Sequence, residues 1–169
     1  GVEMDAAEEI AAEAAQGEIC TAANDNASGQ IVLSGATAAI ERAVEIAAEK
    51  GAKRCILLPV SAPFHCAMMA PAADVMADEL AAMRIEEPII PVVANVTADA
   101  QSAPDEIRRL LVEQVTARVR WRESVLFMKE NGVDTFVEIG AGKVLTGLAR
   151  RIDRDLTGIS IQTPADIEE

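Results

Sequence analysis

Two alanine-rich stretches in the first fifty residues carry apolar side chains at helical spacing. Residues 4–16 and residues 37–50 both place apolar positions three or four apart, so each is predicted to form an amphipathic helix. A glycine follows each stretch, at Gly17 and at Gly51, and is expected to end the helix. The predicted inner faces consist of Ala7, Ile10, Ala11 and Ala14 in the first helix and of Ile40, Val44 and Ala47 in the second.

Three short apolar runs are predicted to be strands of the same unit. The runs at 19–23 and 30–33 flank residues 24–29, whose Asn, Asp, Ser and Gly side chains favour a turn, so we predict a β-hairpin. The run at 54–60 is apolar nearly throughout and is predicted to be a buried strand. This order matches a ferredoxin-like unit that lacks its first strand. Because a sheet without one strand has an open edge, we expect the sequence to begin within a larger protein.

Helical and strand patterns alternate through the rest of the chain. Alternating strands and helices form parallel sheets with crossover helices, so we predict an α/β fold with a truncated ferredoxin-like subdomain at 1–60 and part of a larger α/β domain at 61–169. The larger part is predicted to begin with a helix that has Met69, Ala72, Met76, Leu80 and Met83 on one face, followed by a buried parallel strand at 89–96. Next comes a helix capped by Ser102, which carries Ile107, Leu110, Leu111 and Gln114. The remaining predicted elements are a helix from Trp121 to Asn131, a strand at 135–139, a helix at 143–151 and a strand at 158–161.

Composition and charge exclude several classes of function. The chain has 169 residues and a formal net charge of −13, and only 2% of its residues are aromatic. Such a charge repels nucleic acid phosphates, and few rings are available to stack on bases, so we expect no nucleic acid partner. No apolar run approaches twenty residues, so we also expect no membrane-spanning segment.

The cysteines favour a reducing compartment. Cys20, Cys55 and Cys66 are odd in number and widely separated, so the cytoplasm is the expected location. One histidine and three scattered cysteines match no zinc-binding spacing, and we predict no metal site. Cys66 is adjacent to the histidine, but neighbouring side chains usually point in different directions, so it is not expected to be a nucleophile for it.

The only histidine of the chain, His65, lies between the predicted strand at 54–60 and the helical stretch that follows. Pro63 is expected to end the strand because proline lacks an amide hydrogen. Loops between strands and helices often carry catalytic groups in α/β proteins, and imidazole exchanges protons near neutral pH. A lone histidine is more often structural or merely exposed, so its position alone does not make it catalytic.

Three stretches of the sequence, taken in order and with their spacing, resemble the bacterial malonyl-CoA:acyl carrier protein transacylases. They are residues 24–35, residues 60–66 (Val-Ser-Ala-Pro-Phe-His-Cys) and residues 137–148 (Val-Glu-Ile-Gly-Ala-Gly-Lys-Val-Leu-Thr-Gly-Leu). The resemblance covers nearly the whole chain and corresponds to the second half of such an enzyme. It implies a ferredoxin-like subdomain inserted in a larger α/β-hydrolase-like domain.

The resemblance also implies roles for four residues. His65 corresponds to the general base that activates a serine in a G-x-S-x-G elbow, and Gln114 corresponds to the glutamine whose backbone carbonyl orients the imidazole. Asn24 and Asn26 correspond to asparagines near the mouth of the substrate site, although turn chemistry explains them equally well. The implied reaction moves malonyl from coenzyme A to serine and then to the phosphopantetheine thiol of acyl carrier protein, and it needs neither a metal nor a redox cofactor.

The sequence departs from this family in what it lacks. It contains no G-x-S-x-G, no neighbouring arginine for the malonyl carboxylate and no N-terminal oxyanion glutamine, so the nucleophile is expected in an N-terminal half outside this chain. Ser28 and Ala141 also stand where proline is common. Two alternatives remain open, namely a polyketide-synthase acyltransferase with another acyl group and a non-catalytic ferredoxin-like binding module.

A carrier protein is acidic, so a protein with this net charge needs a local basic surface to bind one. The candidates are Arg118, Arg120, Arg122, Lys143, Arg150 and Arg151.

Overall fold

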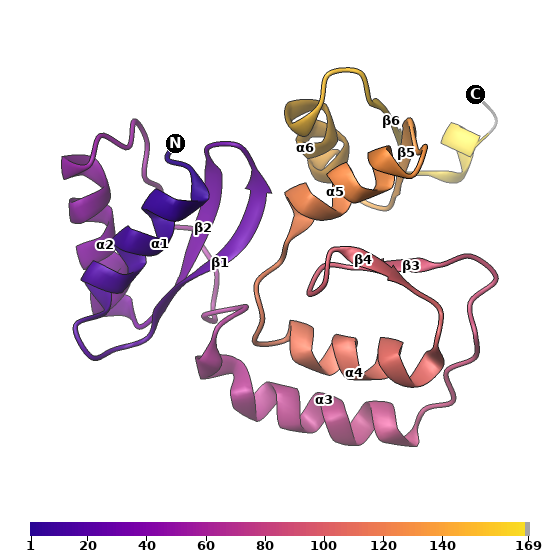
Figure 1. Ribbon diagram of the computed structural model, residues 1–169, viewed down its shortest axis with the longest axis horizontal. Helices are drawn as coiled ribbons and strands as arrows, with labels where there is room; N and C mark the ends of the chain where they lie inside the picture. The colour runs from indigo at the N-terminus through magenta and orange to yellow at the C-terminus, as the bar shows by residue number, and fades with distance from the viewer. Residues whose placement is uncertain (168–169) are drawn as a thin grey trace.

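A computed structural model describes residues 1–167, and these residues form three two-stranded sheets and six α-helices (Figure 1). The predicted α/β class is therefore confirmed. The helices are α1 (Met4–Ala15), α2 (Thr37–Glu49), α3 (Ala70–Ala82), α4 (Pro104–Gln114), α5 (Trp121–Glu130) and α6 (Val144–Ile152). The strands are β1 (Cys20–Ala27), β2 (Gln30–Gly35), β3 (Val92–Ala94), β4 (Asp99–Gln101), β5 (Thr135–Ile139) and β6 (Thr157–Ile161).

Helices α1 and α2 pack against each other beside the β1–β2 hairpin, as the indigo and purple segments of Figure 1 show. The contact between the helices is made largely by alanine, whose small side chain lets two helices approach closely. The buried face of α1 is the predicted one, whereas the buried face of α2 is shifted by one position to Ala39, Ala43 and Ala47, with Ile40 partly buried. Gln16, rather than Gly17, takes the left-handed C-cap of α1.

The hairpin turn is shorter than predicted. Strand β1 continues to Ala27, and only Ser28 and Gly29 connect it to β2, with Gly29 at φ +68°. Two bulges interrupt the pairing, because Ala23 and Asn26 have no partner in the β1–β2 register. The polar residues of β1 remain in a strand because their backbone also bonds to a second segment, near Val119, described below.

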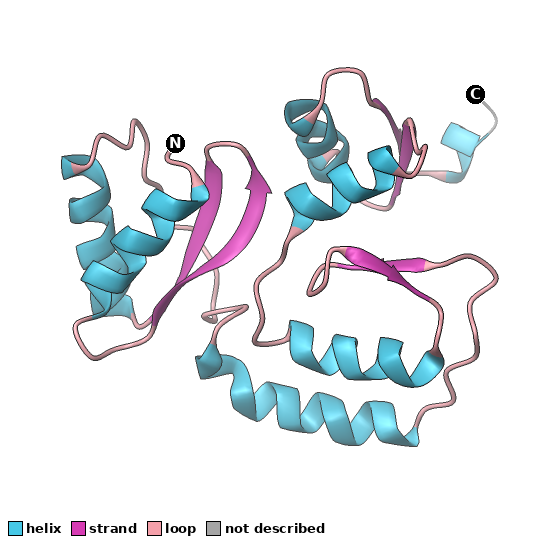
Figure 2. Cartoon of the chain, viewed as in Figure 1, coloured by secondary structure: helices cyan, strands magenta, loops and turns pink. Residues whose placement is uncertain are grey.

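Residues 53–60 do not form the predicted buried strand. Their side chains are exposed, for example Leu57 at 62% and Val60 at 58%, and the segment is drawn as a loop between α2 and α3 (Figure 2). A strand requires a hydrogen-bonded neighbour, and no strand of the described part of the chain lies alongside it. The apolar sequence of this run therefore does not produce a strand in residues 1–167.

The prediction for residues 89–96 was also wrong. Only β3 forms there, and it pairs with β4 in antiparallel orientation through a turn at 95–98. Ile89 and Ile90 precede it and are exposed. The continuous parallel sheet predicted from His65 onward is thus reduced to one parallel pair, β5 and β6.

Helices α3 and α4 lie side by side beside β3 and β4 (Figure 1). Of the predicted apolar face of the first of these helices, Leu80 is buried, whereas Met76 and Met83 are exposed. Helix α4 begins at Pro104 with Ala103 as its N-cap, so Ser102 does not cap it. Proline suits the first helical position because an amide there has no partner within the helix.

The C-terminal elements follow the prediction closely. Strands β5 and β6 pair in parallel, with α6 between them in sequence. Helix α5 ends at Glu130, and the predicted Asn131 is its C-cap. Gly142 in the turn after β5 has φ +95°, a conformation that favours glycine. The Glu138 carboxylate accepts hydrogen bonds from the backbone amide and hydroxyl of Thr146 and from the amide of Leu145, which lowers its pKa and occupies the N-terminus of α6. No helix of the described residues is long and apolar enough to cross a membrane.

Candidate active site

His65 lies in a tight turn and not at the end of a strand. Its φ is +59°, a region that costs a non-glycine residue about 1–2 kcal/mol. The turn is held by Cys66, which is buried and donates its thiol hydrogen to the carbonyl of Pro63 at 3.2 Å. The short 3₁₀ helix Ala67–Met69 follows and leads into α3. Strained backbone of this kind is concentrated at functional sites, where surrounding contacts hold it in place.

The structure brings His65 and Gln114 together although 49 residues separate them. Nδ1 of His65 lies 2.9 Å from the backbone carbonyl oxygen of Gln114. A carbonyl can only accept a hydrogen bond, so this contact places the ring proton on Nδ1 and leaves Nε2 with a free lone pair in the neutral ring. Gln114 is the last residue of α4, where carbonyls have no partner within the helix and carry the negative end of the helix dipole. The arrangement therefore orients the imidazole with Nε2 available to accept a proton.

The Gln114 side chain fixes the turn that follows α4. Its Nε2 donates to the carbonyl of Ala117 at 3.0 Å and to that of Arg118 at 3.4 Å. The amide of Ala117 in turn donates to the carbonyl of Glu113 at 2.9 Å. The residue that offers its carbonyl to His65 is thus itself bonded into a closed turn.

The chain after this turn runs along β1 as a short parallel bridge. The amide of Val119 donates to the carbonyl of Ala23 at 2.8 Å, and the amide of Asp25 donates to the carbonyl of Val119 at 2.9 Å. Arg118 adds a side-chain contact, because its Nε donates to the carbonyl of Ala22 at 3.0 Å. The turn that holds His65 is therefore attached to the β1–β2 hairpin.

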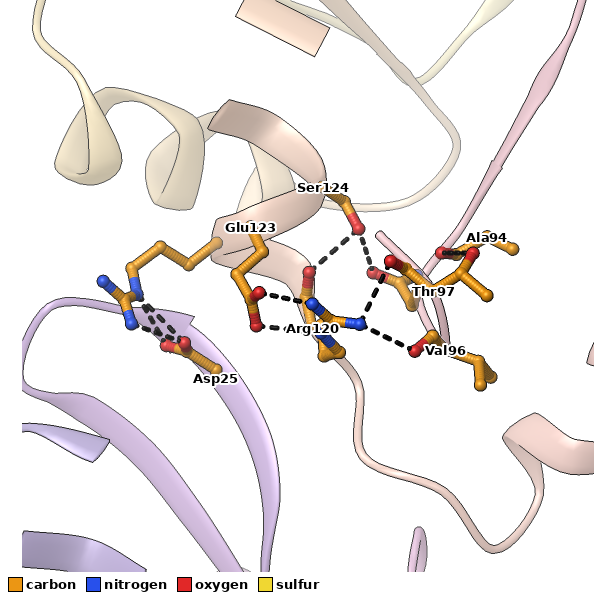
Figure 3. Close-up of polar contacts among 9 residues, drawn as sticks. Asp25, Ala94, Val96, Thr97, Arg120, Glu123 and Ser124 are labelled. Atoms are coloured by element: carbon orange, nitrogen blue, oxygen red, sulfur yellow. Dashed lines mark hydrogen bonds and ion pairs between the residues drawn. The ribbon is translucent and has the colours of Figure 1, made fainter. Parts of the chain in front are cut away.

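A buried ion pair reinforces this attachment. Asp25 is 1% exposed, and both of its carboxylate oxygens lie 3.0 Å from Nε of Arg122, with a terminal guanidinium nitrogen 2.8 Å from Oδ2. Hydrogen bonding to Asp25 raises the pKa of the Arg122 guanidinium. Figure 3 shows Asp25 reaching from β1 toward the first turn of α5. The pair joins β1 to α5.

Arg120 connects the start of α5 to the turn between β3 and β4. It bonds to both oxygens of Glu123 and donates to the carbonyls of Val96 at 3.2 Å and Thr97 at 3.0 Å, as Figure 3 shows. The hydrogen bond from Arg120 lowers the pKa of the Glu123 carboxyl. Ser124 adds a hydrogen bond to the side chain of Asn95 at 3.2 Å. The β3–β4 turn is thereby connected to α5.

A cavity of about 420 Å³ opens beside His65. Of the four predicted site residues, only His65 lines this cavity, and Gln114 is joined to His65 by the hydrogen bond described above. Asn24 and Asn26 are half-buried on β1 and are not among the described residues that line the cavity. A larger hollow of about 530 Å³ between α3 and α4 is lined by paired charges such as Arg109 with Glu113, and it contains no predicted site residue of the described chain. The lining of the first cavity is Thr21, Ala22, His65, Cys66, Ala67, Thr116, Arg118 and Arg120.

Sequence reasoning missed Thr116, Arg118 and Arg120 as neighbours of His65. The available signal was the alternation of arginines at 118, 120 and 122 directly after Gln114, which was interpreted as part of a docking surface. The structure corrects this interpretation, because all three guanidinium groups are bonded within the chain. Arg118 pairs with Glu8, Arg120 with Glu123 and Arg122 with Asp25.

In the described residues, no nucleophilic side chain is a hydrogen-bond partner of the His65 imidazole. His65 makes no side-chain hydrogen bond to a hydroxyl or thiol there, and Cys66 donates elsewhere. Residues 1–167 also contain no group of three His, Cys, Asp or Glu side chains that could hold a metal ion.

Comparison with known proteins identifies the class of protein to which this site belongs. No family model matches the chain. The malonyl CoA-acyl carrier protein transacylase of Haemophilus influenzae is 44% identical over 165 residues, which are 98% of this chain and 53% of that protein. The crystal structure of an acyl-carrier-protein-S-malonyltransferase from Bartonella henselae is 51% identical, with a TM-score of 0.95 over 99% of this chain and 54% of that one.

A third similar structure is a malonyl-transacylase in complex with a type II PKS acyl-carrier protein, at 40% identity and a TM-score of 0.95 over 99% of this chain and 54% of that one. These matches show that the chain is similar, over nearly its whole length, to one class of protein, the malonyl CoA-acyl carrier protein transacylases. This similarity confirms the resemblance seen in the sequence. The chain spans about half the length of the curated relatives it matches.

Proposed function

We propose that this chain supplies the general base of an enzyme that transfers malonyl from malonyl-CoA to the phosphopantetheine thiol of acyl carrier protein. The observation that carries the proposal is the hydrogen bond between His65 Nδ1 and the Gln114 carbonyl, which leaves Nε2 free to accept a proton. We call this chain together with a serine-bearing N-terminal half the complete enzyme, because the 169 residues contain no G-x-S-x-G.

The proposed reaction has two balanced steps. His65 Nε2 takes the serine proton as Oγ attacks the thioester carbon, the carbon–sulfur bond to coenzyme A breaks, and the imidazolium returns its proton to the leaving thiolate. In the second step, His65 takes the proton of the carrier thiol as the carrier sulfur attacks the carbonyl carbon of the malonyl–serine ester. The carbon–oxygen bond to serine breaks, and the imidazolium gives its proton to the serine oxygen. A nucleophile, a base and a leaving group suffice for this reaction, so the proposal includes no metal or redox cofactor. We expect the enzyme to be located in the cytoplasm.

We further propose that residues 1–60 are a ferredoxin-like subdomain short of one strand and that residues 61–169 belong to an α/β-hydrolase-like domain. Large apolar side chains are exposed in both parts of the chain, and exposed apolar surface of this kind can mark an interface. We propose the N-terminal half as its cover. The exposed side chains concerned include Ile56, Leu57, Leu58, Val60, Ile89, Ile90, Ile139 and Val144.

Asn24 and Asn26 enter the proposal as residues near the mouth of the substrate site. Both are half-buried on β1, two positions apart, although a bulge at Asn26 disturbs the regular alternation of the strand. Their amides would contact the coenzyme A or phosphopantetheine portion of the substrates and not the bond that breaks.

Of the six basic residues predicted to bind the carrier protein, we now propose only the three that lie exposed on and near α6. Lys143, Arg150 and Arg151 are exposed, and the contact recorded for Arg151 is to the neutral side chain of Gln30. These residues are the best-placed positive charges for an acidic carrier protein.

Reversing two of these charges, Lys143→Glu together with Arg150→Glu, is expected to raise the KM of the complete enzyme for acyl carrier protein at least tenfold, and more steeply at low salt. Transfer to free pantetheine should stay within about twofold, because a small neutral thiol has no acidic surface to attract. The matched control for net charge is Arg84→Glu together with Lys53→Glu, two exposed positions outside α6. If both acceptors lose activity equally, the surface does not bind the carrier.

A further inference from the structure

Within residues 1–167, the Arg118 side chain is the one that links the turn after Gln114 both to strand β1 and to helix α1. Its backbone carbonyl accepts from the Gln114 side chain at 3.4 Å, and its Nε donates to the carbonyl of Ala22 on β1 at 3.0 Å. Its guanidinium also pairs with Glu8 on α1. A single residue therefore fixes the turn against a strand and a helix that are about a hundred residues away in sequence.

We propose that Arg118 is a positioning residue for His65, which rests on the proposed role of His65 as the base. It acts through Gln114, because the carbonyl that accepts from Nδ1 belongs to the first residue of the turn that Arg118 attaches to β1. Without the guanidinium, the far end of the turn is held to β1 by the backbone bridge at Val119 alone. We expect the Gln114 carbonyl to be positioned less firmly against the imidazole as a result.

Because the Arg118 side chain is partly exposed, we expect its role to be positioning and not a general contribution to folding stability. Its side chain is 33% exposed and that of Glu8 is 48% exposed. Ion pairs between side chains as exposed as these contribute little to folding stability, because water and salt screen them. The parallel bridge at Val119 also remains when Arg118 is replaced. Removal of the guanidinium should therefore change the geometry at Gln114 more than it changes the folding equilibrium.

His65 itself provides the readout, because it is the only histidine of the 169 residues. Labelling the chain with ¹⁵N-histidine gives one imidazole, whose two nitrogens report the tautomer at about pH 9, where the ring is neutral. The native chain should show mainly the Nδ1–H tautomer that the Gln114 carbonyl requires. The imidazole ring of free histidine in water prefers the Nε2–H tautomer.

In Arg118→Ala the share of the Nε2–H tautomer should rise severalfold, toward the ratio of free histidine. Arg84→Ala is the matched control, since it removes an exposed arginine and its ion pair with Glu86 and has no recorded contact with the turn or β1. A tautomer ratio in folded Arg118→Ala equal to that of the native chain and the control would overturn the proposal.

A second variant covers the case in which Arg118→Ala fails to fold, as judged by the fluorescence of the single tryptophan, Trp121. Glu8→Gln weakens the anchor of Arg118 on α1 and leaves its contact with Ala22 in place, and it should shift the tautomer ratio in the same direction by a smaller factor. An unchanged ratio in folded Glu8→Gln would then refute the proposal.

The complete enzyme gives an independent kinetic measurement. Arg118→Ala should lower kcat about tenfold or more with little change in the KM for malonyl-CoA, because a small displacement of a catalytic group is costly whereas the substrate contacts persist. Absence of transfer by the native complete enzyme would refute the proposed function. It would leave the tautomer result standing as evidence on how Arg118 positions the ring.

Discussion

Replacing His65 with asparagine is expected to lower malonyl transfer by the complete enzyme by roughly 10²–10⁴-fold, the usual contribution of a general base. Asparagine is the suitable replacement because it tolerates the positive φ of this position better than alanine does, so the turn should persist. The loss should appear in kcat for both the serine acylation step and the transfer to the carrier, since the same base serves both steps. Pre-steady-state transfer from radiolabelled malonyl-CoA measures the two separately.

Chemical rescue distinguishes a lost base from a lost structural contact. His65→Gly removes the ring, leaves space for a small molecule and suits the backbone conformation. Added imidazole should restore a measurable part of its activity, because the missing group is a proton acceptor. If His65→Asn retains more than a tenth of the native rate, or if imidazole has no effect on His65→Gly, the histidine is not the base.

The largest effect on stability is expected from Arg122→Ala. This change leaves the carboxylate of Asp25, which is 1% exposed, without its guanidinium partner. Removing one member of a buried pair typically costs about 3–5 kcal/mol, and we expect about 3 kcal/mol because the Arg122 side chain is itself 30% exposed. Urea denaturation followed by the fluorescence of Trp121, which adjoins Arg122, measures the change in the free energy of unfolding.

Two further variants isolate the buried charge as the cause. Arg109→Ala removes an exposed, ion-paired arginine of α4 and should destabilise the fold far less than Arg122→Ala does. The double variant Asp25→Asn with Arg122→Gln should recover part of the loss, because it leaves no unpaired charge in the interior. A free-energy change for Arg122→Ala as small as that for Arg109→Ala would contradict the importance of the pair.

The C-terminal elements were predictable because their signals and their partners are local. Asn131 and Gly132 end α5, and the glycines after β5 mark the start of α6. Strand β6 pairs with β5, about twenty residues earlier in the chain. A prediction from periodicity succeeds here because each element packs on its neighbour in sequence.

The strand predictions for residues 54–60 and 89–96 were wrong because most residues of these runs have no such local partner in the described chain. Their hydrophobicity indicates burial, but a strand also needs a hydrogen-bonded partner, and the sequence of a run does not identify that partner. In the described residues Ile89 is fully exposed, which is an unstable position for a large apolar side chain unless another surface covers it.

The site shows the same division between local and distant signals. His65 was identified from its position and its uniqueness, whereas its contact with Gln114 spans 49 residues and was expected only through the family resemblance. The arginines after Gln114 were assigned to a surface because charge alone does not reveal that Asp25, 97 residues away from Arg122, is buried beside it. Asp25 itself was placed in a turn, and only the second backbone partner of β1 explains why it lies in a strand.

The most direct test of the central claim is to locate the malonyl group after brief incubation with malonyl-CoA, using the 169-residue chain alone and the complete enzyme. The chain alone should show no turnover and no covalent malonyl group, because its base has no hydroxyl to activate. In the complete enzyme, peptide mapping should place the malonyl group on a serine outside this chain, and its formation should slow by the factor given above in His65→Asn. Turnover by the chain alone with the malonyl group on one of its own residues, Cys66 being the first to check, would contradict the claim.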